Sequence, residues 1–206
     1  MEKKNTIVHD ALILTAFTLV LGLILGVVYN ITAPSIAAAN EATAQKAYKE
    51  VFTDADSFET QEYDADAANS MLTEAGYSDT IGGVQLAEDA EGQALGYVIT
   101  VTAKDGSQGS ITFSVGIRND GTVNGYSITD ISETPGLGMK AKEADFYSQF
   151  EGKLVDTFSV VKTSPAADNE IQAITGSTIT SKAMANGCNA ALLYFRNVLQ
   201  GGAANE

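Results

Sequence analysis

The feature that most constrains this chain is a long apolar run near its N-terminus. Between Ala11 and Ile31 no residue is charged, and leucine, valine, isoleucine, phenylalanine and alanine dominate. An α-helix rises about 1.5 Å per residue, so a helix of this length crosses a hydrocarbon core about 30 Å thick. The run therefore predicts one transmembrane helix at the start of the chain.

The basic residues on either side of the run predict its orientation. Lys3 and Lys4 precede it, whereas the first basic residue after it is Lys46. Because lysine and arginine are enriched on the cytoplasmic side, we expect a cytoplasmic N-terminus and an extracytoplasmic chain after Pro34. The alternative is a cleaved signal peptide, since residues 37–39, Ala-Ala-Ala, resemble a small-residue cleavage site. The apolar run exceeds the usual signal core, which favours a retained anchor.

The segment after the anchor is expected to be helical and then irregular. Pro34 and Ser35 are expected to break or cap the anchor, and Ser35–Phe52 carries apolar residues at helical spacing. Thr53–Asp66 is rich in acids and has no regular apolar period. It also lacks the glycine and terminal glutamate spacing of a calcium loop. We interpret it as a solvated surface.

Beyond Gly82 the apolar period changes to two, which is typical of half-buried strands. Strands are expected at Gly96–Thr102, around Ile111–Arg118 and at Thr122–Ile131. The tripeptide Asn-Asp-Gly at 119–121 is typical of a tight hairpin turn. Such short connections make neighbouring strands antiparallel, so the predicted fold class is α+β.

The C-terminal part is expected to alternate helix and strand. The expected elements are a helix at Ala141–Phe150, a strand at Leu154–Lys162 and a helix at Lys182–Leu199. The aromatic residues Phe146, Tyr147 and Phe150 are expected to pack on the sheet rather than to line a ligand cavity. We expect Gly201–Glu206 to be a frayed end.

Composition limits the chemistry that this chain can perform. A net charge of −14 argues against nucleic-acid binding, because phosphates select basic surfaces. The single cysteine, Cys188, excludes an intramolecular disulfide and a multi-cysteine metal site, and its helical spacing with Met184 and Leu192 predicts a buried thiol. The single histidine, His9, lies beside the membrane segment, which argues against a Ser-His-Asp arrangement. The chemistry must therefore come from a cofactor.

A hydroxyl-rich loop precedes the last predicted helix. Residues 174–181 read Ile-Thr-Gly-Ser-Thr-Ile-Thr-Ser. Helix starts present unpaired N–H groups and the positive end of the helix dipole, so this loop is a candidate phosphate site. The alternative is ordinary capping, in which Thr180 or Ser181 caps the helix and Thr178 is a turn residue.

A second loop makes the ligand hypothesis stronger. Residues 133–140 read Glu-Thr-Pro-Gly-Leu-Gly-Met-Lys, and their Pro-Gly turn allows close approach of the backbone to a flat ligand. Two such loops in one small domain indicate a shared ligand.

With these two loops the chain resembles the FMN-binding G subunit of the Rnf-type ion-translocating electron transport complex. The related C subunit of the sodium-pumping NADH:quinone oxidoreductase is similar too. The family's Glu-Thr-Pro-Gly-Leu-Gly loop is present without substitution at Glu133–Gly138, and its Ser/Thr-Gly-Ala-Thr loop corresponds to Thr175–Thr178. Ser177 replaces the usual alanine, and Gln172 stands where an aspartate often opens the motif. The acceptor hydroxyl is retained.

The resemblance implies that FMN is esterified through its phosphate to Thr178. It implies no metal, and the expected architecture is an anchor at residues 1–34 followed by a single FMN-binding domain at 35–206, with an antiparallel sheet and flanking helices. The protein residues expected to contact the cofactor are Glu133, Thr134, Gly136, Leu137, Lys140, Thr175, Gly176, Ser177, Thr180 and Ser181. Lys182 is a further candidate charge partner. The implied partners are the other subunits of an Rnf-type complex and, during maturation, a flavin transferase that uses FAD.

The implied function is electron relay in a membrane complex that couples ferredoxin:NAD⁺ electron transfer to sodium or proton translocation. One alternative is a membrane-anchored FMN carrier of a quinone reductase or of an extracellular electron transfer chain. A third is a non-redox, pilin-like surface protein, for which no flavin is expected.

Overall fold

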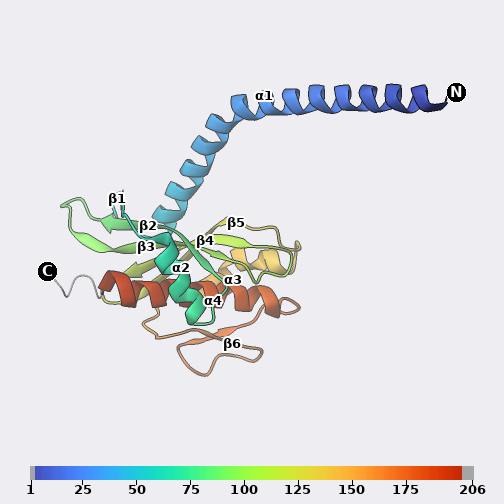
Figure 1. Cartoon of the computed structure of the whole chain (residues 1–206). Helices are drawn as coiled ribbons and strands as arrows, with labels where there is room; N and C mark the ends of the chain where they lie inside the picture. Colours follow the sequence, from blue (N-terminus) through green and yellow to red (C-terminus); the bar gives the residue numbers. More distant parts are fainter. Residues whose placement is uncertain (1–2, 201–206) are drawn as a thin grey trace. The chain divides into compact units, whose positions relative to one another are not determined.

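The computed structural model describes residues 3–200 and divides into two compact units, Met1–Thr43 and Ala44–Glu206. The predicted frayed end at Gly201–Glu206 lies outside the described residues. The two units share one long helix, α1, at Lys3–Val51 (Figure 1). The predicted boundary after Pro34 therefore falls inside a helix.

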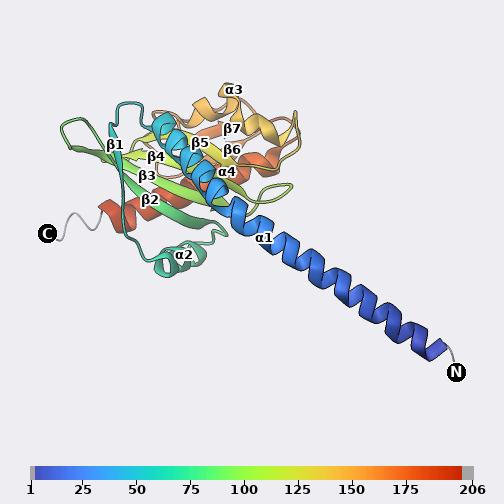
Figure 2. The same cartoon turned by 90° about the horizontal axis from the view of Figure 1, so that it is seen from above.

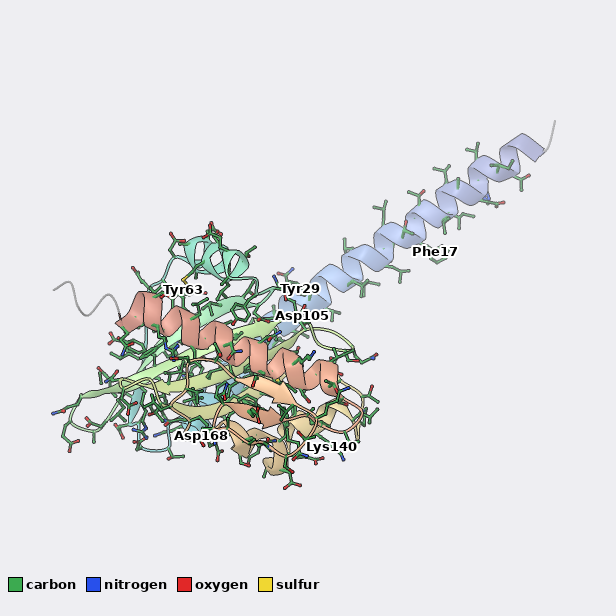
Figure 3. The ribbon with its side chains drawn as sticks, turned by 90° about the horizontal axis from the view of Figure 1, so that it is seen from below. Phe17, Tyr29, Tyr63, Asp105, Lys140 and Asp168 are labelled. Carbon is green, nitrogen blue, oxygen red and sulfur yellow. The ribbon has the colours of Figure 1, made fainter. Side chains whose placement is uncertain are left out.

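Helix α1 contains one segment that is long and apolar enough to cross a membrane, by length and composition. Its large apolar side chains are exposed along this segment, with Phe17 at 64% and Tyr29 at 69% (Figure 3). The expected break at Pro34 is wrong, because α1 continues through it. A proline in a helix interior removes one N–H donor, so the carbonyl of Asn30, four residues before Pro34, loses the backbone N–H that would normally bond to it.

The second unit is built on a five-stranded antiparallel sheet, seen from above in Figure 2. Its strands follow in chain order from edge to edge: β1 (Ser57–Thr60), β2 (Thr80–Glu88), β3 (Ala94–Ala103), β4 (Ile111–Arg118) and β5 (Val123–Asp130). The three strands expected beyond Gly96 are confirmed, and so is the hairpin turn at 119–121, which the Arg118 N–H closes on the Thr122 carbonyl at 2.8 Å. The α+β class is confirmed.

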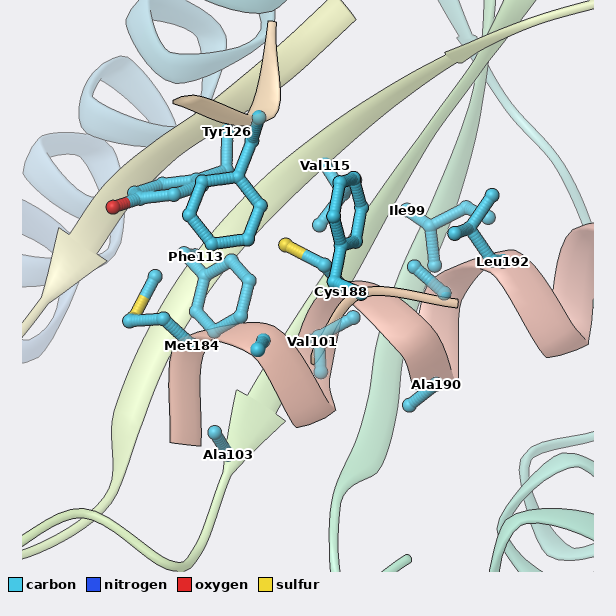
Figure 4. Packing of buried hydrophobic residues seen from close by; sticks show 14 of the residues in the cluster. Ile99, Val101, Ala103, Phe113, Val115, Tyr126, Met184, Cys188, Ala190 and Leu192 are labelled. Carbon is cyan, nitrogen blue, oxygen red and sulfur yellow. The ribbon is translucent and has the colours of Figure 1, made fainter. Parts of the chain in front are cut away.

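The two faces of the sheet are covered by different helices. Helix α4 (Thr178–Tyr194) lies across one face, where Ile99 and Phe113 meet Met184, Cys188 and Leu192 in the main core (Figure 4). The predicted burial of Cys188 is confirmed, and burial raises the pKa of its thiol. A smaller cluster on the other face packs the last residues of α1 against β2 and β3. Its members are Tyr48, Val51, Phe52, Ala55, Ala87 and Val98.

The acidic segment is a solvated surface, as expected, because most of residues 53–66 are exposed, but it also contains regular structure. Ser57–Thr60 forms edge strand β1, and the Asp64 side chain caps helix α2 (Ala65–Glu74) by accepting the Ala67 N–H at 3.0 Å. An edge strand needs little apolar surface, and Phe58 is the only residue of β1 that is partly buried. Neither element therefore produces a regular apolar period in the sequence.

The predicted elements between 141 and 172 are shorter than expected. The helix breaks into three short turns, η1 (Gly138–Lys142), α3 (Ala144–Tyr147) and η2 (Ser148–Phe150), although Phe146 and Phe150 are buried in the core as expected. Of the strand predicted at Leu154–Lys162, only β6 (Ser159–Val161) forms, and it pairs in parallel with β7 (Glu170–Gln172). The last helix begins at Thr178, earlier than Lys182, and continues as a π-helical turn, η3 (Phe195–Gln200).

Candidate functional site

Three loops meet around one cavity at the end of the sheet where α4 begins. The cavity measures about 300 Å³, within the range of small-molecule sites. One wall comes from the loop after β5, the second from the loop before α4, and the third from the β3–β4 loop. The lining residues are Ser107, Glu133, Thr134, Leu137, Gly138, Gly176, Ser177, Thr178 and Ile179.

The loop after β5 is a tight turn held by its own backbone. The Leu137 N–H donates to the Thr134 carbonyl at 3.1 Å, with Pro135 and Gly136 between them. Gly136 has φ +75°, the left-handed conformation that the third position of a type II turn requires. The turn directs Leu137 onto the loop before α4, where its Cδ2 would lie 3.2 Å from a Cβ at Gly176. The two predicted ligand loops are therefore in contact.

The loop before α4 is fastened by Ser181 rather than by a conventional cap. The Ser181 hydroxyl accepts the Ile174 N–H at 3.0 Å and donates to the Ser177 carbonyl at 2.9 Å. Ser177 is the N-cap residue, but its side chain makes no capping bond within the described chain. The capping alternative for Thr180 or Ser181 is wrong, because both lie inside the first helical turn.

The first turn of α4 presents hydrogen-bond donors and the partly exposed Thr178 at the cavity. The first intrahelical bond runs from the Ser181 N–H to the Ser177 carbonyl at 3.0 Å. The N–H groups of Thr178, Ile179 and Thr180 therefore have no acceptor among residues 3–200. Thr178 is the first helical residue, is partly exposed and lines the cavity. This arrangement suits a phosphate ester, because free amides and the helix dipole favour negative charge.

The other predicted site residues fall into two groups outside this cavity. Lys140 and Thr175 line a neighbouring cavity of about 230 Å³, and Figure 3 shows Lys140 near the end of the domain where α4 begins. Thr180 and Ser181 are fully buried beneath the first turn. The Thr180 hydroxyl has no hydrogen-bond partner in the part of the chain that the structure describes. Gly136 shapes its turn and lines neither cavity.

Sequence reasoning missed Ser107 and the side chain of Ile179 as parts of the cavity wall. Topology offered a signal for Ser107. In an antiparallel meander, the β3–β4 loop and the C-terminal end of β5 lie at the same end of the sheet. For Ile179 the signal in the sequence was an apolar residue among the hydroxyl residues of a predicted ligand loop. In the structure this side chain is 60% exposed.

A buried carboxylate lies under the β3–β4 loop. Asp79, just before β2, is only 2% exposed, and neither of its oxygens has a partner with hydrogen-bonding geometry within residues 3–200. Burial, and then the nearby Asp105 carboxylate, raise the pKa of Asp79 to about 6, while the Lys104 backbone N–H acts in the opposite direction. Lys104 and Asp105 belong to the β3–β4 loop, which also contains the cavity residue Ser107.

Comparison with known proteins identifies the class to which this fold and cavity belong. Residues 106–193 match the FMN-binding domain, and residues 1–51 match the RnfG N-terminal region. The solved structure of NqrC from Shewanella oneidensis aligns with a TM-score of 0.50 at 18% identity, over 60% of this chain and 61% of that chain. The C subunit of the Na⁺-translocating NADH-quinone reductase from Parabacteroides distasonis aligns with a TM-score of 0.50 at 24% identity, over 69% and 77%. The fold is that of an FMN-binding domain.

Curated relatives narrow the class to a family. The chain is 32% identical over 191 residues to the G subunit of the proton-translocating ferredoxin:NAD⁺ oxidoreductase complex of Clostridium ljungdahlii, an alignment that covers 93% of this chain and 92% of that protein. It is 40% identical over 111 residues to the G subunit of the Na⁺-translocating ferredoxin:NAD⁺ oxidoreductase complex of Acetobacterium woodii, covering 53% of each chain. This protein belongs to the G-subunit family of ion-translocating ferredoxin:NAD⁺ oxidoreductase complexes, as the two loops predicted. The Acetobacterium alignment spans about half of that relative.

Proposed function

We propose that this protein is the FMN-carrying electron-relay subunit of a membrane complex that moves electrons between ferredoxin and NAD⁺ and couples this transfer to ion translocation. Three findings support the proposal: membership of the G-subunit family, the match to the FMN-binding domain, and an apolar helix long enough to span a membrane. The bound flavin would supply reversible electron transfer, and the protein would supply its attachment and orientation.

The attachment residue in this proposal is Thr178. The observation that carries the assignment is its position: Thr178 is the first helical residue of α4, and it lines the cavity shared by the two family loops. Its hydroxyl adjoins the three free N–H groups of the first turn. Gly176, with φ +81°, bends the backbone so that this turn faces the cavity.

The attachment step would be a phosphoryl transfer from FAD. The Thr178 oxygen attacks the phosphorus of the FMN half, and the bond between this phosphorus and the bridging oxygen breaks. AMP leaves with the bridging oxygen, and the hydroxyl proton passes to a base of the flavin transferase. No electrons are exchanged, and the product is FMN esterified to the protein. Within this cavity the free N–H groups would hold the phosphate oxygens, and Leu137 would supply apolar contact.

Orientation completes the proposal. With Lys3 and Lys4 before the apolar run and Lys46 the first basic residue after it, the flavin domain lies on the extracytoplasmic side. A covalent ester is useful on that side, because a dissociated flavin would be lost by dilution.

The test is mass spectrometry of the full chain, purified in detergent after co-expression with its flavin transferase. We expect a mass gain of one FMN less one water on the peptide that contains Thr178. Thr178→Val, which keeps the shape and removes the hydroxyl, should abolish the gain, whereas Thr178→Ser should retain it. Thr175→Ala is the matched control, because Thr175 lines the neighbouring cavity. An unmodified wild-type chain beside a demonstrably active transferase would sink the assignment.

A further inference from the structure

Glu133 lies where the three loops of the site come together. Its side chain is 6% exposed. One carboxylate oxygen, Oε1, accepts the Ser107 N–H at 2.6 Å and the Gln108 N–H at 3.3 Å. These two donors belong to the β3–β4 loop, which supplies one wall of the cavity. These two donors satisfy Oε1, so this oxygen of the buried side chain is not left without partners.

The rest of the Glu133 side chain packs against Gly138 and the start of α4. A Cβ added to Gly138 would lie 2.6 Å from Oε2 of Glu133, 2.8 Å from the Cβ of Glu133 and 2.8 Å from the Thr180 hydroxyl oxygen. These separations are shorter than real carbon contacts, so only a glycine fits between Glu133 and Thr180. The buried Thr180 side chain belongs to the first turn of α4, next to Thr178.

We infer that Glu133 is a positioning residue, which joins the β3–β4 loop, the loop after β5 and, through Gly138, the first turn of α4. Its Oε1 holds the Ser107–Gln108 turn, and the rest of the side chain packs against Gly138, which in turn lies close to Thr180. The inference deepens the proposed function of the same cavity, because the flavin would then meet a wall that is already assembled. It adds a structural role to the expectation that Glu133 contacts the flavin.

Electrostatics supports a structural role over direct contact with the phosphate end of the ligand. An ionised carboxylate beside a phosphate ester would repel it, and the first turn of α4 offers N–H groups for the phosphate instead. Two N–H donors to Oε1 account for a buried carboxylate in an anion site. A role as acceptor requires an oxygen at the right distance, but it does not require the negative charge.

The experiment must distinguish whether Glu133 acts through an oxygen at the right distance or through its negative charge. Glu133→Gln keeps an acceptor oxygen at the same reach and removes the charge, whereas Glu133→Asp keeps the charge and withdraws the oxygen by one methylene. Amide hydrogen exchange is measured by mass spectrometry on the full chain without flavin, in detergent. The peptide that contains Ser107 and Gln108 is followed, with a peptide from β4 as the internal control.

We expect Glu133→Gln to exchange like the wild type at residues 107 and 108, and Glu133→Asp to exchange about tenfold faster there, as follows from losing one hydrogen bond. The β4 peptide should not change in either variant. Equal exchange in all three proteins would overturn the inference, as would fast exchange in Glu133→Gln, because the charge would then be what matters. Both substitutions are conservative, so loss of the fold in Glu133→Gln also counts against an acceptor role.

A second readout separates this inference from the proposed function. Flavin occupancy at Thr178 is measured over time with the transferase and FAD. We expect Glu133→Asp to load several-fold more slowly than Glu133→Gln. If no flavin attaches even to the wild type, the flavin proposal fails, while the exchange result on the flavin-free chain still decides the role of Glu133.

Discussion

The side-chain amide of Asn189 holds both backbone groups of Phe158. The Phe158 N–H donates to Asn189 Oδ1 at 2.6 Å, and Asn189 Nδ2 donates to the Phe158 carbonyl at 3.0 Å. The amide on helix α4 therefore bonds to the chain before β6 as a neighbouring strand would. Both residues are buried, at 6% and 4% exposure.

This pairing predicts a large cost when the amide is lost. Asn189→Ala leaves the N–H and the carbonyl of Phe158 buried without partners, at about 1–3 kcal/mol for each group. We expect the melting temperature to fall by several degrees, since 1 kcal/mol corresponds to roughly 2–4 °C in a chain of this size. Far-UV circular dichroism is the suitable probe, because the chain contains no tryptophan. Asn186→Ala, at a partly exposed position on the same helix, is the control and should change little. An unchanged melting temperature in Asn189→Ala would contradict the role assigned to this pair.

The same pairing shows why part of the fold escaped sequence prediction. Leu154–Lys162 reads as a strand, but Phe158 bonds to a side chain of α4, and the Arg196 guanidinium donates to the carbonyls of Val155 and Asp156 at 2.7 and 3.1 Å. Side-chain groups from α4 and η3, 31 to 41 residues away, thus replace strand partners. Local periodicity carries no information on such contacts. The strands beyond Gly96 were predictable, because apolar and polar residues alternate along their sequences and short turns join them.

The candidate site was predictable to a similar extent. The two loops were found because their sequences are distinctive, and the structure brings Leu137 against Gly176. The sequence could not show that Ser181 is fully engaged with backbone groups, or that Glu133 bonds to the β3–β4 loop. Both facts depend on tertiary contacts, which give a residue a structural role that its type alone does not reveal.

We expect the stability of the fold to depend on pH, because the buried carboxyl of Asp79 titrates at a different pH in the folded and the unfolded chain. Its pKa is about 6 in the folded chain and near the ordinary 3.8 when unfolded. Because the pKa is higher in the folded chain, folding favours the protonated carboxyl. Its contribution to the free energy of unfolding is therefore fully present below pH 3.8 and is lost as the pH rises through about 6. Asp79→Asn, which cannot ionise, should therefore be more stable than the wild type at pH 7.5, by about 1–3 kcal/mol. Near pH 4 the difference should largely disappear.

Melting temperatures of both proteins from pH 4 to pH 8 check the Asp79 prediction. Asp105→Asn serves as the control, because removing the neighbouring carboxylate should shift the transition of the wild-type group to lower pH. A pH profile that is identical in the wild type and Asp79→Asn would show that Asp79 does not titrate in this range.

Two glycines of the loop after β5 should respond to alanine for different reasons. Gly138→Ala places a methyl group 2.8 Å from the Cβ of Glu133 and 2.8 Å from the Thr180 hydroxyl, so we expect an overpacking cost of about 1–3 kcal/mol. Gly136→Ala meets no atom within 4 Å, but its φ of +75° costs about 1 kcal/mol. Melting temperatures compare the two, and flavin occupancy shows whether the distortion reaches Thr178. A greater loss in Gly136→Ala would mean that Glu133 and Thr180 move aside easily.

Of two serines at the start of α4, the N-cap residue Ser177 should contribute less to stability than Ser181 inside the first turn, which reverses the usual order. An N-cap serine ordinarily contributes about 1 kcal/mol, but the Ser177 side chain makes no capping bond within the described chain, so Ser177→Ala should leave the melting temperature nearly unchanged. Ser181→Ala removes an acceptor from the buried Ile174 N–H and a donor to the Ser177 carbonyl, which should cost about 1–3 kcal/mol.

Ser177→Ala also restores the alanine that is usual in the family loop, so it should accept flavin at least as well as the wild type. Thermal denaturation and flavin occupancy, measured on the same two variants, check both statements. A marked destabilisation by Ser177→Ala would show that this hydroxyl caps α4 in solution and competes with the ligand for the N–H groups of the first turn.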